Sequence, residues 1–430
     1  MQTGKYLAGY AKLDITPFIG CRIIDLGKDV VGTGVLDPLY VRAIAFSDGE
    51  KKSVIMVLDN WIGVPDYLEW IPKLAKELNM DEESINYFAT HSHATPCISE
   101  NEEYDAFVYH RMKDAITIAL DDLKPVTDVM WTDERAEGFF HTRRYRMVDG
   151  AVHTNPVRRE RRIVAPAENF DDTMRVIRIL RQGGKEIDII NGQAHPNNGS
   201  SLRYTASYPG LLCANFERMN DDAECLYLNG AEGDMITRGP EPFELGKDAE
   251  WDIDYSFRLA KLATEMRGRA VSTETEGFSF KKGGVTVKTK RDPSRLEEAK
   301  RIRELFNSGR RDEIDPDPKE ALNKGAEAGN IVWLEETGEY TRDVPLTVIG
   351  FCGVAIAGIC GEPFSQVGIN IREASPFKTT CIGCFANGGK GYFPTEEAYK
   401  NGGYESHNTP IAIGAAELIT EETIKLLNEI

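Results

Sequence analysis

Short apolar runs alternate along the chain with segments whose apolar positions follow a helical period. Residues 53–58 (SVIMVL) and 85–90 (INYFAT) are apolar runs that predict buried strands. Residues 102–123 predict a long helix. Two further apolar runs, 174–180 and 187–194, flank a Gly-Gly pair and predict a hairpin. This alternation of strands and helices predicts an α/β fold.

The longest uncharged run, residues 344–361, approaches the ~20 residues that a membrane-spanning helix requires. It contains Pro345 and four glycines, and Asp343 and Glu362 border it. Proline and glycine interrupt helices and mark turns. We therefore expect two buried strands joined by a tight turn, and no insertion into a membrane.

The helix-rich stretch at about 292–330 includes the charged, proline-interrupted segment 310–319 (RRDEIDPDPK). We expect solvated surface helices here that take no part in catalysis. The sequence contains no internal repeat, no low-complexity tract and no segment typical of a linker. These observations predict a single large domain, residues 1–430, with a mixed sheet, flanking helices and a helical surface excursion at about 292–330.

Composition narrows the range of partners. The 430 residues include 51 Lys and Arg against 69 Asp and Glu, which gives a net charge of −18. Because nucleic acids and anionic lipids both attract basic surfaces, this charge argues against either as a partner. Residues 1–12 do not resemble a signal peptide, and the eight cysteines follow no secreted spacing pattern. We expect free thiols, including buried Cys381 and Cys384, and a cytoplasmic protein.

Three of the seven histidines directly follow predicted strands. His91 and His93 follow the run 85–90, His195 follows the predicted hairpin, and Glu362 follows the long uncharged run. Active sites of α/β folds form where strand ends gather at a sheet edge. Two or three histidines with a carboxylate suit a catalytic zinc ion. In His-x-His both side chains can face the same way if the backbone stays extended, so one can bind metal while its neighbour acts on substrate.

A turn with two glycines follows the predicted strand at 225–228. Gly230 and Gly233 would let backbone N–H groups approach a ligand closely, so the turn can cradle an oxyanion or a hydroxyl. An ordinary tight turn, with Asp234 capping the next helix, explains the same residues equally well.

Eight segments of the sequence carry a further signal: 9–17 (GYAKLDITP), 39–45 (LYVRAIA), 90–96 (THSHATP), 194–196 (AHP), 205–210 (TASYPG), 361–363 (GEP), 391–399 (GYFPTEEAY) and 404–405 (YE). In this order they resemble the N-terminal catalytic domain of the neutral/alkaline non-lysosomal ceramidase family, across nearly the whole chain. The family's ceramidases carry a serine two residues after their Gly-Asp turn, where this sequence has Ile236. A serine nucleophile at that place is therefore not expected, whereas attack by water remains available.

The resemblance implies a role for individual residues. It assigns acid/base work to His93, a hydrogen bond to the substrate carbonyl to Tyr404, and an active-site arginine to Arg143, with Arg144 as the close alternative. We add Gly230, Asp234 and His407 as candidate substrate-binding residues, and Asp59 as a residue that, like Asp234, holds ligands in place. The metal ligands implied for zinc (Zn2+) are His91, His195, Glu362 and Tyr392.

The expected function is a zinc-dependent hydrolase that cleaves an amide (N-acyl) bond with metal-activated water. The sequence has no counterpart of the C-terminal immunoglobulin-like domain of longer ceramidases, so we expect a small, water-soluble substrate rather than ceramide. An ester or lactone hydrolase and a non-catalytic metal-binding relative remain open alternatives. The sequence is silent on the oligomeric state.

Overall fold

A computed structural model describes residues 5–23, 30–65, 68–156, 162–197, 202–240 and 248–430. Its largest element is a nine-stranded mixed sheet in the order β14-β12-β11-β6-β1-β3-β4-β5, with β16 also pairing with β6. The pairs β4/β5 and β12/β14 are parallel, and the others are antiparallel. The strands are β1 (Leu7–Asp14), β3 (Tyr40–Ser47), β4 (Lys52–Leu58), β5 (Ile85–Ala89), β6 (Lys124–Arg135), β11 (Thr173–Arg181), β12 (Glu186–Gly192), β14 (Ala223–Asn229) and β16 (Val271–Ser272).

A second, four-stranded sheet packs against one face of the first. Along β18, Ile349 and Phe351 join the apolar core shared with the nine-stranded sheet, whereas Leu346 and Val348 face the opposite way. This alternation is what a strand with period two produces when both faces are covered. The expected pair of strands within 344–361 is therefore confirmed. The sheet has the order β17 (Phe278–Lys288), β18 (Thr341–Phe351), β19 (Val354–Ile359) and β21 (Thr379–Gly383).

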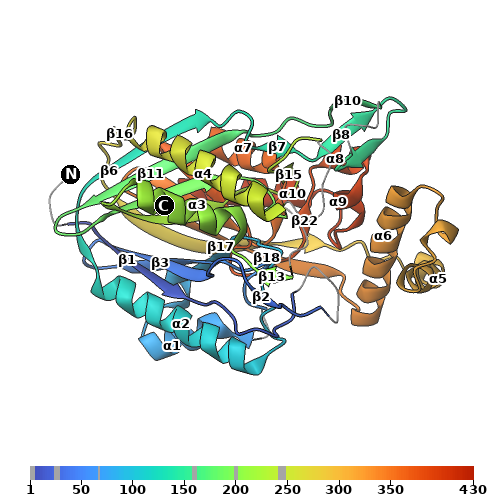
Figure 1. Cartoon of the computed structure of the whole chain (residues 1–430), viewed down its shortest axis with the longest axis horizontal. Coiled ribbons are helices and arrows are strands. Elements are labelled where there is room, and N and C mark those ends of the chain that lie inside the picture. Colours follow the sequence, from blue (N-terminus) through green and yellow to red (C-terminus); the bar gives the residue numbers. More distant parts are fainter. Residues whose placement is uncertain (1–4, 24–29, 66–67, 157–161, 198–201, 241–247) are drawn as a thin grey trace.

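Helices cover the two outer faces, which gives four layers (Figure 1). On the nine-stranded sheet, α1 (Trp70–Leu78) and α2 (Glu102–Asp121) cover one half, and α3 (Ser207–Met219) and α4 (Asp248–Arg267) cover the other. The outer face of the four-stranded sheet packs against α7 (Ser365–Ala374) and α10 (Ala415–Asn428). The expected α/β class, with a large mixed sheet and flanking helices, is confirmed.

Short strands connect segments that lie far apart in the sequence. β20 (Glu362–Pro363) pairs in parallel with β22 (Tyr392–Phe393), which sets Glu362 opposite Tyr392. β15 (Met235–Ile236) pairs with β7 (His141–Thr142). The other short elements are β2 (Gly34–Val35), β8 (Arg144–Met147), β9 (Val152–Thr154), β10 (Ile163–Pro166), β13 (Arg203–Tyr204), α8 (Glu396–Asn401) and α9 (Tyr404–His407).

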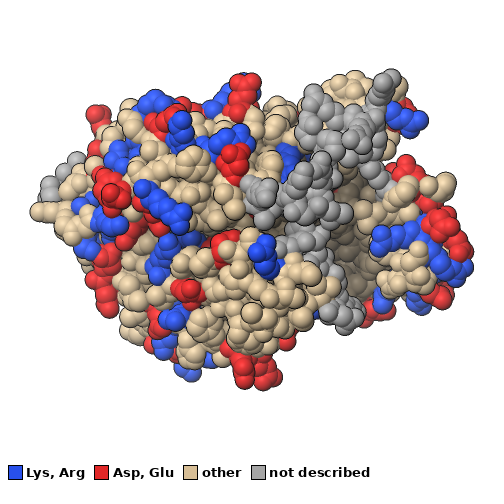
Figure 2. All heavy atoms as spheres, viewed as in Figure 1, with Lys and Arg blue, Asp and Glu red and all other residues tan. Residues whose placement is uncertain are grey.

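The helical excursion extends between β17 and β18. It contains α5 (Leu296–Asn307) and α6 (Pro318–Thr337), which share a small apolar core that includes Ile302 and Ile331. Acidic and basic side chains are interspersed over its outer surface, at the right of Figure 2. Its helix α6 lies against α9 (Figure 1).

All eight cysteines are free, and Cys381 and Cys384 are buried as expected. Among the described residues, no helix has the length and apolar content needed to cross a bilayer.

Candidate metal centre

Two histidine-bearing strand ends meet although their strands lie far apart in the sheet order. His91 follows β5 at one edge, and His195 follows β12 beside the other edge strand, β14. Asn229, the last residue of β14, joins them. Its Nδ2 donates to the Thr90 carbonyl at 3.1 Å, and its Oδ1 accepts from the Ala194 N–H at 3.3 Å. The two ends of the strand order therefore approach each other at the site, so the residues gather between two edges rather than along one.

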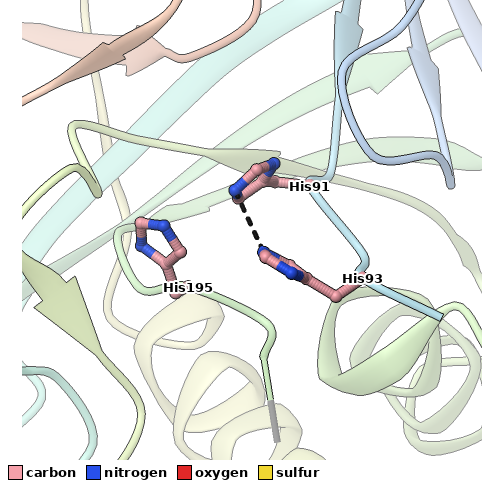
Figure 3. Close-up of side chains that lie close together, drawn as sticks. All are labelled: His91, His93 and His195. Atoms are coloured by element: carbon pink, nitrogen blue, oxygen red, sulfur yellow. Dashed lines mark hydrogen bonds between the residues drawn. The ribbon is translucent and has the colours of Figure 1, made fainter. Parts of the chain in front are cut away.

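His91 owes its orientation to an unusual backbone. Its φ is +67°, in the left-handed region that residues other than glycine rarely occupy. The condition of an extended backbone that we set for His-x-His is therefore not met at His91. The Nδ1–H of His91 donates to the Trp61 carbonyl at 2.8 Å, which leaves the lone pair of Nε2 directed inward. The Nε2 of His93 lies 3.2 Å from this atom (Figure 3).

His195 has acceptors on both sides of its ring. Its Nδ1 lies 2.8 Å from the Glu232 carbonyl and 3.2 Å from the Met235 carbonyl, so Nδ1 carries a proton and Nε2 is the ring nitrogen that can bind an ion once it loses its own proton. That Nε2 is 3.1 Å from Glu362 Oε2, and His91 Nε2 is 3.6 Å from the same oxygen. One potential ligand atom from each of His91, His195, Glu232 and Glu362 lies within 4.8 Å of the others. All four residues are buried.

Tyr392 completes the set of predicted ligands. Because β20 and β22 are paired, its hydroxyl reaches to 3.5 Å from His195 Nε2. The Arg143 guanidinium lies over its ring at 5.2 Å, and the Tyr404 ring lies 6.3 Å away in an edge-on arrangement. The structure therefore brings the four residues predicted as ligands close to one another.

The electrostatics of the two buried histidines differ. Burial, and the neighbouring His93 and His195, hold the pKa of His91 well below its usual range. Burial and Arg143 also lower the pKa of His195, but Glu232 and the hydrogen bond to Glu362 outweigh them and raise this pKa to about 9. The two carboxylates thus favour positive charge at His195, whereas burial disfavours it at His91. Zinc that took the place of the Nε2 proton of His195 would meet two imidazole nitrogens with carboxylate and phenol oxygens, which are donors that suit zinc.

The two candidate arginines have different surroundings. Arg143 Nη2 donates to the Gly233 carbonyl at 2.6 Å and its Nε lies 2.8 Å from Glu405 Oε1, beside Tyr392. Arg144 is directed away from this group. Its Nη1 is 2.7 Å from Glu405 Oε2, and its Nε is 3.0 Å from Glu168 Oε2. Of the two, the structure brings Arg143 to the predicted ligands.

The glycine turn packs against the strand that carries Glu362. The Gly233 N–H donates to the Pro363 carbonyl at 2.9 Å, and a Cβ on Gly233 would lie only 2.5 Å from the Glu362 carbonyl oxygen. Asp234 accepts from the Ser365 backbone N–H at 2.7 Å at the start of α7. Burial raises the pKa of Asp234 to about 7, although the Ser365 hydrogen bonds oppose this shift. The turn therefore holds the Glu362 segment in place.

Other candidates lie apart from the ligand group. Gly230 donates its N–H to the Gly192 carbonyl at 2.8 Å, at the end of β12. Asp59 pairs with buried Arg42 at 2.8 Å. His407 lies on α9 with its Nδ1 3.9 Å from Glu327 Oε2, so it contacts the helical excursion.

Two features of the turn refine the sequence analysis. Ile236 forms a β-bridge with His195 and pairs with His141, so the position of the family's serine is occupied by a strand residue. Glu232, which the sequence analysis did not single out, is fully buried beside His195. A carboxylate within the otherwise uncharged stretch 226–233 (LYLNGAEG) was the signal that could have identified it.

Comparison with known proteins supports the fold. No protein-family profile matches the sequence, and no curated protein matches it. Among solved structures, neutral ceramidase from Pseudomonas aeruginosa superposes with a TM-score of 0.73 and 13% identity, over 98% of this chain and 74% of that one. A ceramidase complexed with C2 gives a TM-score of 0.71 and 14% identity, over 98% and 75%. The resemblance expected from the sequence is confirmed at the level of structure, and the chain has the neutral ceramidase fold.

Proposed function

We propose that this protein is a zinc-dependent hydrolase that cleaves the amide (N-acyl) bond of a small molecule, with water as the nucleophile. The observation that carries the proposal is the convergence of His91, His195, Glu362 and Tyr392 from four separate segments of the chain. Zinc in such a site supplies Lewis acidity and a hydroxide nucleophile near neutral pH. The similarity to ceramidase structures supports an amide as the bond that is cleaved.

The residues around the ligands have distinct proposed roles. His93 is half-buried and adjacent to His91, so it can pass a proton to the leaving nitrogen, a contribution that is typically about 10²–10⁴-fold. Tyr404 donates a hydrogen bond to the substrate carbonyl as charge develops on its oxygen. Arg143 holds Tyr392 and orients a polar part of the substrate. Ile236 provides no nucleophile, so the attacking group comes from solvent.

The test combines metal analysis with turnover of a panel of N-acyl amides and matched esters. The panel includes water-soluble compounds and a short-chain ceramide. We expect about one zinc per chain, turnover of water-soluble amides, and a loss of about 10²-fold or more in His93→Ala with zinc retained. His110→Ala, at an exposed histidine on α2, is the matched control. Zinc-loaded protein that turns over no member of the panel would contradict the proposal.

A further inference from the structure

Glu232 is a buried carboxylate that the proposed reaction does not use. It is 0% exposed, and its Oε2 is in ion-pair contact with His195 Nδ1. Apart from this contact, neither carboxylate oxygen has a hydrogen-bond partner among the residues that the structure describes. A buried charge with so few partners is costly, so its position next to a single imidazole requires an explanation.

We propose that Glu232 is a positioning residue for the metal ligand His195. The role rests on the proposed function. The Glu232 carboxylate accepts a hydrogen bond from His195 Nδ1–H, and this bond fixes the orientation of the ring and makes Nε2 a stronger electron-pair ligand for the ion. Metal-binding histidines commonly donate their second ring nitrogen to a carboxylate or a carbonyl, with this effect.

The two histidines provide an internal comparison. The Nδ1 of His91 meets a neutral carbonyl, that of Trp61, at 2.8 Å. The Nδ1 of His195 meets the Glu232 carbonyl and, in addition, the Glu232 carboxylate. Glu232 and Glu362 therefore lie on opposite sides of the His195 ring, one at Nδ1 and the other at Nε2. An ion bound by Nε2 and Glu362 would thus lie at the opposite ring nitrogen from the one that Glu232 contacts, although a Glu232 carboxylate oxygen lies within 4.8 Å of ligand atoms of the other three residues.

The backbone explains how Glu232 reaches this place. Its turn is fixed on both sides, because Gly230 bonds to Gly192 at the end of β12 and Gly233 bonds to Pro363 beside Glu362. The Glu232 carbonyl also accepts from Met235 N–H at 2.9 Å. The turn that carries Glu232 therefore links the segments that present His195 and Glu362, and the charge of Glu232 complements a divalent cation.

The test measures zinc affinity with a competing chromophoric chelator for wild type and Glu232→Gln. We expect one zinc per chain in both, with the affinity reduced about 10–100-fold in the variant. Asp188→Asn is the control, because Asp188 is an equally buried carboxylate on β12 that pairs with Arg267 instead. We expect its zinc affinity to remain unchanged. Equal affinity of Glu232→Gln and wild type would overturn the inference and leave the proposed function intact.

Two further measurements separate positioning from other roles. The difference in unfolding midpoint between Glu232→Gln and wild type should be larger with zinc than without it, because the variant also loses part of the stabilisation that the bound ion provides. A purely structural role predicts instead an equal loss with and without zinc. Cobalt-substituted Glu232→Gln should keep the wild-type coordination number in its visible spectrum, and a changed number would make Glu232 a ligand and overturn the inference. Wild-type protein that binds no zinc would contradict the proposed function itself.

Discussion

The candidate metal centre and the helical excursion contain the same kinds of side chain in opposite electrostatic settings. In the excursion cluster, which we define as Arg295, Glu327 and His407, all three side chains are partly exposed and Arg295 Nη2 lies 2.9 Å from Glu327 Oε2. His407 and Arg295 hold the pKa of Glu327 well below its usual range, since their hydrogen bonds outweigh its partial burial. There Arg295 and the hydrogen bond with His407 satisfy the carboxylate.

At the metal centre the balance is reversed. His195 is buried between two carboxylates, Glu232 and Glu362, and its pKa is raised to about 9 despite burial and the charge of Arg143. A histidine near acidic residues therefore does not by itself mark a cation site. Burial beside two carboxylates is what distinguishes His195 from His407. The four predictions below test this contrast by changing matched residues in the two regions.

The largest difference is expected between His195→Ala and His407→Ala. Removal of His195 deletes one of two imidazole ligands, so zinc should fall from about one per chain to near zero and activity should fall to background. His407→Ala should retain zinc and most activity, because the His407 imidazole lies beside Glu327 on α6. Elemental analysis and turnover on the amide panel measure both effects. If His195→Ala retained zinc, His195 would not be a required ligand, and the proposed difference between the two regions would be contradicted.

Glu405→Ala tests the buried support of the centre. Its carboxylate is fully buried and lies 2.8 Å from Arg143 Nε and 2.7 Å from Arg144 Nη1. Removal of this carboxylate takes one partner from the buried guanidinium groups of Arg143 and Arg144. We therefore expect a loss of about 3–5 kcal/mol in the free energy of unfolding. Glu327→Ala in the excursion cluster should cost about 1 kcal/mol or less, because its pair is partly solvated. Denaturant titration compares them, and equal losses would contradict the contrast.

Zinc removal should destabilise only protein with an intact centre. A ligand that binds the folded state alone contributes about 2.7 kcal/mol when its free concentration is 100 times Kd. Chelation should therefore lower the unfolding midpoint of wild type and of Glu327→Ala by the same amount. His195→Ala should show no such shift. Scanning calorimetry with and without chelator measures it, and a chelator-dependent shift in His195→Ala would place the stabilising ion elsewhere.

The sequence alone predicted the parts of the fold that depend on local patterns. The strands before His91 and His195 and the two strands within 344–361 are where their apolar runs place them. What the sequence could not predict is how those strands associate. Two edges of one curled sheet meet through the side chain of Asn229, and only a folded chain reveals that contact.

The site shows the same division between local pattern and tertiary contact. Positions at strand ends identified His91 and His195, and the resemblance supplied Tyr392. The choice between Arg143 and Arg144 depended on which of two adjacent residues points toward Tyr392, a matter of strand register that sequence spacing does not resolve. The sequence did not predict a role for Glu232, because its proposed role depends on a contact with His195, which is 37 residues away in the chain.

The smallest effects are expected when one methyl group is added in each region by a glycine-to-alanine substitution. Gly233→Ala would place a Cβ 2.5 Å from the Glu362 carbonyl, so the turn or β20 must shift, at a cost of about 1–3 kcal/mol. Gly329→Ala lies within α6, where a Cβ meets nothing within 4 Å, and it should stabilise the protein by about 1 kcal/mol. The first variant should also bind zinc more weakly, because Glu362 moves with its backbone, whereas the second should bind it normally. Denaturant titration and chelator competition on the same two proteins provide the measurements. If Gly233→Ala kept wild-type zinc affinity, close packing of the turn would not be what fixes Glu362.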